Sequence, residues 1–347
     1  MEDVILYCFK SGETMRYTTL YHLLKGKKTS SILVFGKFYG LLDFFNLFPK
    51  LSQQDFTRII YQLVDKGYLT VVDDNKVQIS KEGEAEVQWE SFRLVNLKQR
   101  KYDRVDQLFF QRLSFATQIV SNKVHEFTQY EPIDNDAFHQ MRMKVWLDHH
   151  KEADLPIIFF EEWKQVITSL NKTEQSILVE QLSGFNEVGL TINQISNLLD
   201  YSPIAGYLIY KTALHKVLDD LNQNKEAFPI FFSLFGSILE ELPPGSIDVT
   251  RRLFLNGASP QEIANQRRLK LSTISDHLIE LFITSSITEL RNVIPKDILL
   301  NISAYKQTVN SDFKNWKYSD VVRSVKGLEF YVFRWCQFYF VEQEVIG

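Results

Sequence analysis

Several kinds of residue and motif are scarce in this chain of 347 residues, and each absence narrows the classes of protein to consider. Cysteine is limited to Cys8 and Cys336, with no Cys-x-x-Cys pair, so we expect no disulfide framework and a reducing cytoplasm. The most apolar stretches, near 228–239 and 330–341, are too short to cross a bilayer. We therefore expect neither an export segment nor a membrane partner.

Motifs of catalysis and cofactor binding are also missing. The chain has no Gly-x-Ser-x-Gly, Gly-x-Gly-x-x-Gly or His-Glu-x-x-His pattern. The run Gly26-Lys27-Lys28-Thr29 resembles part of a phosphate-binding loop, but Tyr21 and His22 stand where that loop requires a glycine. The pair His149-His150 lacks the further ligands that complete a metal site. We expect no catalysis, cofactor or metal.

The charge of the chain is unevenly distributed. Hydrophobic residues make up 45% and charged residues 24%, which is typical of a globular protein, and the net charge is −4. Residues 10–81 contain eleven Lys or Arg against six Asp or Glu, a local net of +5 that leaves −9 for the remainder. The chain is therefore not expected to coat nucleic acid indiscriminately, but its N-terminal part has a basic character.

The N-terminal part has the pattern of a winged helix. Phe56, Ile59, Ile60 and Leu63 follow helical spacing up to Gly67, and two short strands are expected at 68–72 and 76–80. The opposite face of this helix contains residues that can reach DNA, namely Gln54, Arg58, Tyr61, Gln62 and Asp65. Our DNA-binding candidates here are Lys27, Lys28 and Arg58; a merely solvated helix is the alternative. The acidic tip, Asp73 and Asp74, argues against insertion of the wing into a groove.

The middle of the chain has the sequence pattern of packed helices. Apolar spacing predicts a helix over 105–127 and another from Pro156. It also predicts a degenerate helix-turn-helix, the second one beside the C-terminal unit described below, whose helices begin near Thr191 and at Ser202-Pro203. Its apolar residues Tyr207, Ile209 and Tyr210 favour packing over groove binding. The run 229–239 is expected to be buried, 243–245 to form a hinge, and 318–341 to form one closing helix.

Residues 259–281 predict a C-terminal helix-turn-helix. Ser259 and Glu262 form a capping box around Pro260, and Ser272 is expected to cap the second helix. That helix should bury Ile274, Leu278 and Leu281, leaving Ser272, Thr273, Ser275, Asp276 and Glu280 outward. In such units the second helix lies in the major groove, so two outward carboxylates weaken a plain DNA interpretation.

Basic residues flank this second helix. The C-terminal candidates for phosphate contact are Arg267, Arg268 and Lys270, with Ser272 and Thr273 at the helix start, where backbone donors favour an anion. Over 248–281 five bases oppose four acids, a net of only +1. A protein-interaction module with the same topology therefore stays open as an alternative.

Parts of the sequence resemble a known family. The segments 259–264, 269–270, 272–274 and 277–278 resemble the helix-turn-helix domain at the C-termini of RecQ-type helicases, and 318–323 looks like its closing segment. With its Gly26–Ser30 segment and its length, the whole chain is similar to YpbB-type bacterial proteins. This resemblance implies a RecQ-type helicase as partner. One departure is Arg268, which stands where such domains usually have glycine and which we expect to need a left-handed backbone.

Together these patterns predict a mainly α fold with three domains. These are a winged-helix-like domain with a small β-hairpin at 1–95, a helical middle domain at 96–241 and a helix-turn-helix domain at 242–347. We expect a non-enzymatic, cytoplasmic DNA-binding or docking accessory of a RecQ-type helicase, binding DNA weakly and in a salt-dependent way. A transcriptional regulator and a scaffold without nucleic-acid binding are the alternatives, and the oligomeric state is left open.

Overall fold

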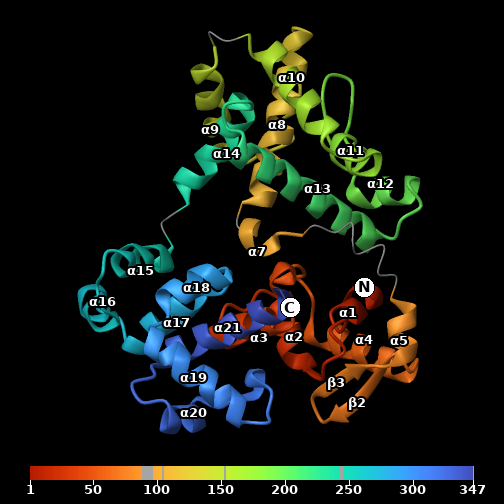
Figure 1. The fold of residues 1–347 in the computed structure, drawn as a ribbon. Helices are drawn as coiled ribbons and strands as arrows, with labels where there is room; N and C mark the ends of the chain where they lie inside the picture. Colours follow the sequence, from red (N-terminus) through yellow and green to blue (C-terminus); the bar gives the residue numbers. More distant parts are fainter. Residues whose placement is uncertain (88–96, 104, 152–153, 243–244, 347) are drawn as a thin grey trace. The chain divides into compact units, whose positions relative to one another are not determined.

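The computed structural model describes residues 1–347 except 88–96, 104, 152–153, 243–244 and 347, and Figure 1 shows its helices and strands. The described chain is mainly helical with one small sheet, which confirms the predicted fold class. None of its helices is long and apolar enough to cross a membrane. It divides into two compact units: the middle unit, within residues 88–243, and the terminal unit, which combines residues 2–87 with 244–347.

This division differs from the three domains expected at 1–95, 96–241 and 242–347. The boundaries near 88 and 243 lie close to the expected ones, but the first and last segments pack into one unit. The physical reason is an apolar and ionic contact between them. Phe38 packs edge-on against Phe338, with ring centroids 6.5 Å apart, and Lys37 Nζ lies 2.5 Å from Glu342 Oε1. Spacing patterns within one segment contain no information about such a contact.

The N-terminal half of the terminal unit combines helices with a three-stranded antiparallel sheet of order β1-β3-β2. Val77 of β3 pairs with Met15 of β1, and Ile79 pairs with Leu69 of β2. The elements are α1 (Glu2–Tyr7), β1 (Met15–Arg16), α2 (Tyr17–Leu24), α3 (Ser30–Phe38), a 3-10 turn (Leu42–Phe44), α4 (Gln53–Asp65), β2 (Leu69–Asp73), β3 (Lys76–Ile79) and α5 (Lys81–Glu86).

Helix α4 and the hairpin after it form as the sequence predicts. Ser52 caps α4 by accepting a hydrogen bond from the Asp55 N–H at 3.0 Å. The apolar stripe is buried, and the chain leaves the helix through Gly67 at φ 76°, a backbone conformation that glycine adopts without strain. The predicted helix and the two strands after it are therefore present, and a winged helix stays a prediction.

The C-terminal half of the terminal unit is helical throughout. Its elements are α15 (Ser246–Leu255), α16 (Pro260–Arg267), α17 (Leu271–Phe282), α18 (Ile287–Val293), α19 (Lys296–Thr308), a 3-10 turn (Phe313–Asn315), α20 (Tyr318–Ser324) and α21 (Phe330–Ile346). Helix α21 packs against α17, α18 and α3, and its buried Trp335 donates a hydrogen bond to the Leu278 carbonyl at 3.0 Å. The single helix expected over 318–341 is wrong, because the chain turns between α20 and α21 at Gly327, φ 75°.

The middle unit is a helical assembly around α13. Its elements are α7 (Gln99–Tyr102), α8 (Asp106–Val124), α9 (Ala137–His149), α10 (Leu155–Thr168), α11 (Lys172–Val179), α12 (Ile192–Leu198), α13 (Pro203–Gln223) and α14 (Pro229–Glu241). Helix α13 packs against α8, α11, α12 and α14, and Ser202 caps it as predicted. Helices α12 and α13 pack against each other where the second, degenerate helix-turn-helix is predicted, and Tyr210 of α13 is buried. The helix-turn-helix itself stays a prediction. Residues 243–244 of the expected hinge lie outside the described chain.

A polar network on one face of α13 ties α7 and α8 to it. Lys211 Nζ lies 2.5 Å from Asp106 Oδ2. His215 lies between Asp106 and Lys98, and its Nδ1 accepts a hydrogen bond from the Lys98 N–H at 3.0 Å. Because Nδ1 accepts, Nε2 carries the proton and donates to Asp106 at 3.1 Å. One turn further on, Asp219 accepts hydrogen bonds from Lys101, Lys98 and Tyr102.

This network predicts part of the acid sensitivity of the middle unit. Burial alone would raise the pKa of Asp219, but hydrogen bonds from Lys101, Lys98 and Tyr102 outweigh it and lower the pKa to about 2. A lowered carboxyl pKa adds stability above the ordinary value of 3.8, and this stability is lost as the pH falls through 2. The difference in urea midpoint between the wild type and Asp219→Asn should therefore shrink between pH 5 and 2. A Glu226→Gln control should track the wild type, and a pH-independent difference for Asp219→Asn would contradict the assignment.

Candidate nucleic-acid interface

The first helix of the C-terminal helix-turn-helix is fixed by its capping box. The Ser259 hydroxyl accepts from the Glu262 N–H at 3.3 Å, and the Glu262 carboxylate accepts from the Ser259 N–H at 2.8 Å. These reciprocal bonds satisfy two backbone donors at the start of α16. Ile263 and Ala264 point inward and are buried. The capping box predicted from the sequence is confirmed.

Arg268 occupies the turn between α16 and α17 in the left-handed conformation, at φ 53° and ψ 41°. The Leu269 N–H closes the end of α16 by bonding to the Ala264 carbonyl at 3.0 Å. The expectation that this position needs a left-handed backbone is therefore confirmed. Its side chain is exposed at the tip of the turn.

Helix α17 begins earlier than the sequence predicted. Lys270 is its N-cap residue, no side chain caps it, and Ser272 lies in its first turn, so the expected capping role of Ser272 is wrong. The Thr273 N–H already bonds to the Lys270 carbonyl at 2.9 Å. The buried face consists of Ile274, Leu278, Ile279 and Phe282, whereas Leu281 is only half-buried.

The two outward carboxylates of α17 are held by the N-terminal half of the same unit. The Ser30 hydroxyl donates to Asp276 Oδ1 at 2.6 Å, and Lys28 Nζ lies 2.8 Å from Glu280 Oε1. Only 14% of the Glu280 side chain is exposed, and α3 packs against α17. Two side chains on the face that a major-groove reader would turn to the bases are thus engaged within the protein, although Asp276 stays exposed.

The predicted cations divide into engaged and available side chains. Arg267 donates to Ser246 Oγ at 2.8 Å and to Thr250 Oγ1, which ties α16 to α15. Lys27, Arg268 and Lys270 are exposed, and the described residues include no ion-pair partner for them. Thr273 is half-buried beside the exposed Ser272. The structure therefore brings Lys27 and Lys28 to the helix-turn-helix from the other end of the chain.

No contact in the described chain connects Arg58 with Lys27, Lys28 or the helix-turn-helix. It is exposed on α4 and forms an ion pair with Asp55 at 2.7 Å, one turn earlier. The outward residues predicted on α4 (Gln54, Arg58, Tyr61, Gln62 and Asp65) are all exposed. Sequence reasoning missed Ser30, because a hydroxyl that pairs with a carboxylate 246 residues away leaves no local pattern.

Comparison with known proteins supports the resemblance predicted from the sequence. A family model described as a helix-turn-helix domain matches residues 246–327, which include α15 to α20. The chain is also similar to Protein YpbB of Bacillus subtilis (strain 168), with 20% identity over 305 residues that cover 85% of each chain. No solved structure matches the chain. These matches support a YpbB-type protein that carries this helix-turn-helix domain toward its C-terminus.

The left-handed turn gives a test that separates backbone strain from charge. Arg268→Gly should raise the free energy of unfolding by up to ~1 kcal/mol, because glycine adopts this conformation without strain. Arg268→Ala removes the same charge but keeps the strain, so its stability should stay close to that of the wild type. Urea unfolding measures both, and equal stability of the glycine and alanine variants would contradict a strained turn.

Proposed function

We propose that this protein is a non-enzymatic DNA-binding and docking accessory of a RecQ-type helicase. The helix-turn-helix match over residues 246–327 supports DNA as a ligand. The helicase partner rests on the resemblance of the sequence to the helix-turn-helix domain of RecQ-type helicases and to YpbB-type proteins. We assign no reaction to the chain.

The observation that carries this proposal is the tip of the helix-turn-helix. Arg268 and Lys270 are exposed there, and the start of α17 has no side-chain cap. Uncapped backbone N–H groups and the positive end of the helix dipole favour a phosphate. Lys27 adds a further exposed cation beside Lys28, which holds α17. DNA would therefore be held by its backbone at this tip.

The contacts on the outward face of α17 argue more strongly against an operator-reading regulator than against a scaffold without nucleic-acid binding. An operator-reading regulator needs a free recognition helix and paired half-sites, but Ser30 and Lys28 engage Asp276 and Glu280 on the outward face of α17. A scaffold that never meets nucleic acid would account for the engaged Asp276 and Glu280. It would leave the exposed cations of the tip without a role, and it predicts no DNA binding even at low salt.

Phosphate binding at the tip should appear in the salt dependence of DNA affinity. For the wild type, log Kd should rise linearly with log salt for two unrelated duplexes alike. Lys27→Ala, Arg268→Ala and Lys270→Ala should each lower the slope by about 0.9, the value for one lost phosphate contact. Arg58→Ala should lower it less, because Asp55 already neutralises Arg58.

Fluorescence anisotropy from 50 to 200 mM salt measures these slopes, with Lys172→Ala on the middle unit as a matched control. A wild type that fails to bind either duplex at low salt would contradict DNA binding. Unchanged slopes for all three tip variants would contradict the assigned surface.

The helicase half of the proposal has a separate test. Purified RecQ-type helicase from the same organism should be retained by the immobilised protein before and after nuclease treatment, since a docking surface does not depend on DNA. Retention that disappears with nuclease would reduce the association to shared DNA, and no retention would remove the helicase from the proposal.

A further inference from the structure

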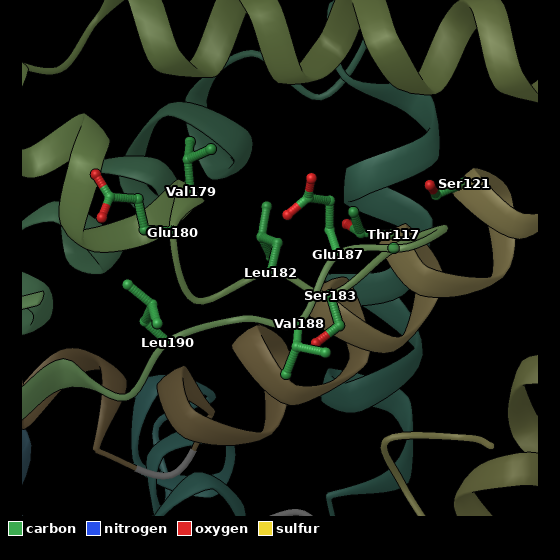
Figure 2. Close-up of a pocket in the computed structure, with 10 residues that line it drawn as sticks. Thr117, Ser121, Val179, Glu180, Leu182, Ser183, Glu187, Val188 and Leu190 are labelled. Atoms are coloured by element: carbon green, nitrogen blue, oxygen red, sulfur yellow. The ribbon is translucent and has the colours of Figure 1, made fainter. Parts of the chain in front are cut away.

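The middle unit contains a groove of about 520 Å³ that the proposed DNA-binding role does not use. One wall is formed by α8 with Thr117 and Ser121, and the other by the segment from Val179 to Leu190. Figure 2 shows the side chains of Glu180 and Glu187 on either side of Leu182 in this view. The groove therefore combines two carboxylates with apolar side chains such as Leu182 and Val188.

The segment that lines the groove is held in shape by its own hydrogen bonds. The Leu190 N–H donates to the Glu180 carbonyl at 2.7 Å, and Gly184 and Glu187 exchange backbone bonds of 3.0 and 3.3 Å. The Phe185 N–H donates to Ser121 Oγ at 3.0 Å, which fixes the segment to α8. A Cβ at Gly184 would lie 2.6 Å from that oxygen, so glycine permits the close approach. The groove is thus preformed.

The chain segment around the groove is acidic, in contrast to the basic residues 10–81. From 173 to 210 the chain contains four acids (Glu174, Glu180, Glu187 and Asp200) and no Lys, Arg or His. Glu174 is engaged by Lys216 at 2.6 Å, whereas Glu180 and Glu187 are exposed and form no ion pair within the described chain. The nearest lysine on α8, Lys123, lines a neighbouring depression instead. Such a surface repels phosphates and attracts cations.

Apolar residues lie exposed beside these carboxylates. Val188, which follows Glu187, is 87% exposed, and Val179, which precedes Glu180, is 37% exposed. Leu182 and Leu190 complete the apolar lining. A long cationic side chain fits this combination, because its methylene stem can cover apolar surface while its head pairs with a carboxylate.

We propose that this groove binds a protein segment in which Lys or Arg side chains alternate with apolar residues. The cationic heads pair with Glu180 and Glu187, and the apolar side chains pack on Leu182 and Val188. Charge complementarity selects this occupant over DNA. The site adds a protein-binding function in the middle unit, independent of the phosphate contacts assigned to the helix-turn-helix.

The test uses the full chain and a pair of short fluorescein-labelled peptides. One alternates arginine and leucine with glycine spacers, and the other has glutamate in place of each arginine. The arginine peptide should bind at low salt and the glutamate peptide should not. Glu180→Gln with Glu187→Gln should weaken arginine-peptide binding about fivefold, the combined effect of two exposed ion pairs. Glu226→Gln, an equal change on an exposed acid elsewhere in the middle unit, should leave binding unchanged.

A cation placed in the groove gives a second test. Val188→Lys changes a side chain that is 87% exposed, so the urea midpoint should stay that of the wild type. It should weaken binding of the arginine peptide, because it removes apolar contact area and adds a like charge beside Glu180 and Glu187. Equal binding of both peptides to the wild type, equal losses for Glu226→Gln and the double variant, or no binding at low salt would each overturn the proposal.

DNA affinity distinguishes this proposal from the one above. The Glu180→Gln, Glu187→Gln variant should bind duplex DNA as the wild type does. If the protein binds the arginine peptide but no DNA, the groove proposal is supported and the proposed DNA binding is contradicted. If it binds DNA but not the arginine peptide, the proposed DNA binding is supported and the groove proposal is contradicted.

Discussion

The contact between the start of α3 and the outward face of α17 determines the architecture of the terminal unit. Ser30 donates to Asp276, and Lys28 pairs with Glu280, so two carboxylates that would otherwise face a DNA groove are satisfied within the protein. The pairing of Lys37 with Glu342 continues this contact along α3. Residues from both ends of the chain therefore form one unit, in which two outward side chains of α17 are engaged by the N-terminal segment.

Each unit exposes a local surface with charge of one sign. The terminal unit exposes Arg268 and Lys270 near an uncapped helix start, which suits a polyanion. The middle unit exposes Glu180 and Glu187 beside apolar side chains in a groove, which suits a cationic protein segment. These surfaces are local features of a chain that has a net charge of −4.

Local chemistry was predictable from the sequence, and long-range pairing was not. The capping box of Ser259 and Glu262, the left-handed Arg268 and the buried stripe of α4 depend on neighbours within four residues, and all three are confirmed. The start of α17 was misplaced because Ser272 has cap chemistry but the Lys270 carbonyl closes the turn first. The break between α20 and α21 at Gly327 is not predicted because a single glycine inside an apolar pattern does not by itself end a helix. The engagement of Asp276 by Ser30 lies beyond any periodicity, since the partners are 246 residues apart.

We infer that DNA is held by its backbone and that α17 does not read its bases. Selection of bound duplexes from a random-sequence pool tests this inference most directly, because it reports base reading regardless of affinity. We expect a recovered pool without a consensus after repeated rounds, and little recovered DNA of any sequence for Arg268→Ala with Lys270→Ala. A recurrent motif with symmetrically spaced half-sites would show α17 in the major groove and would overturn the inference.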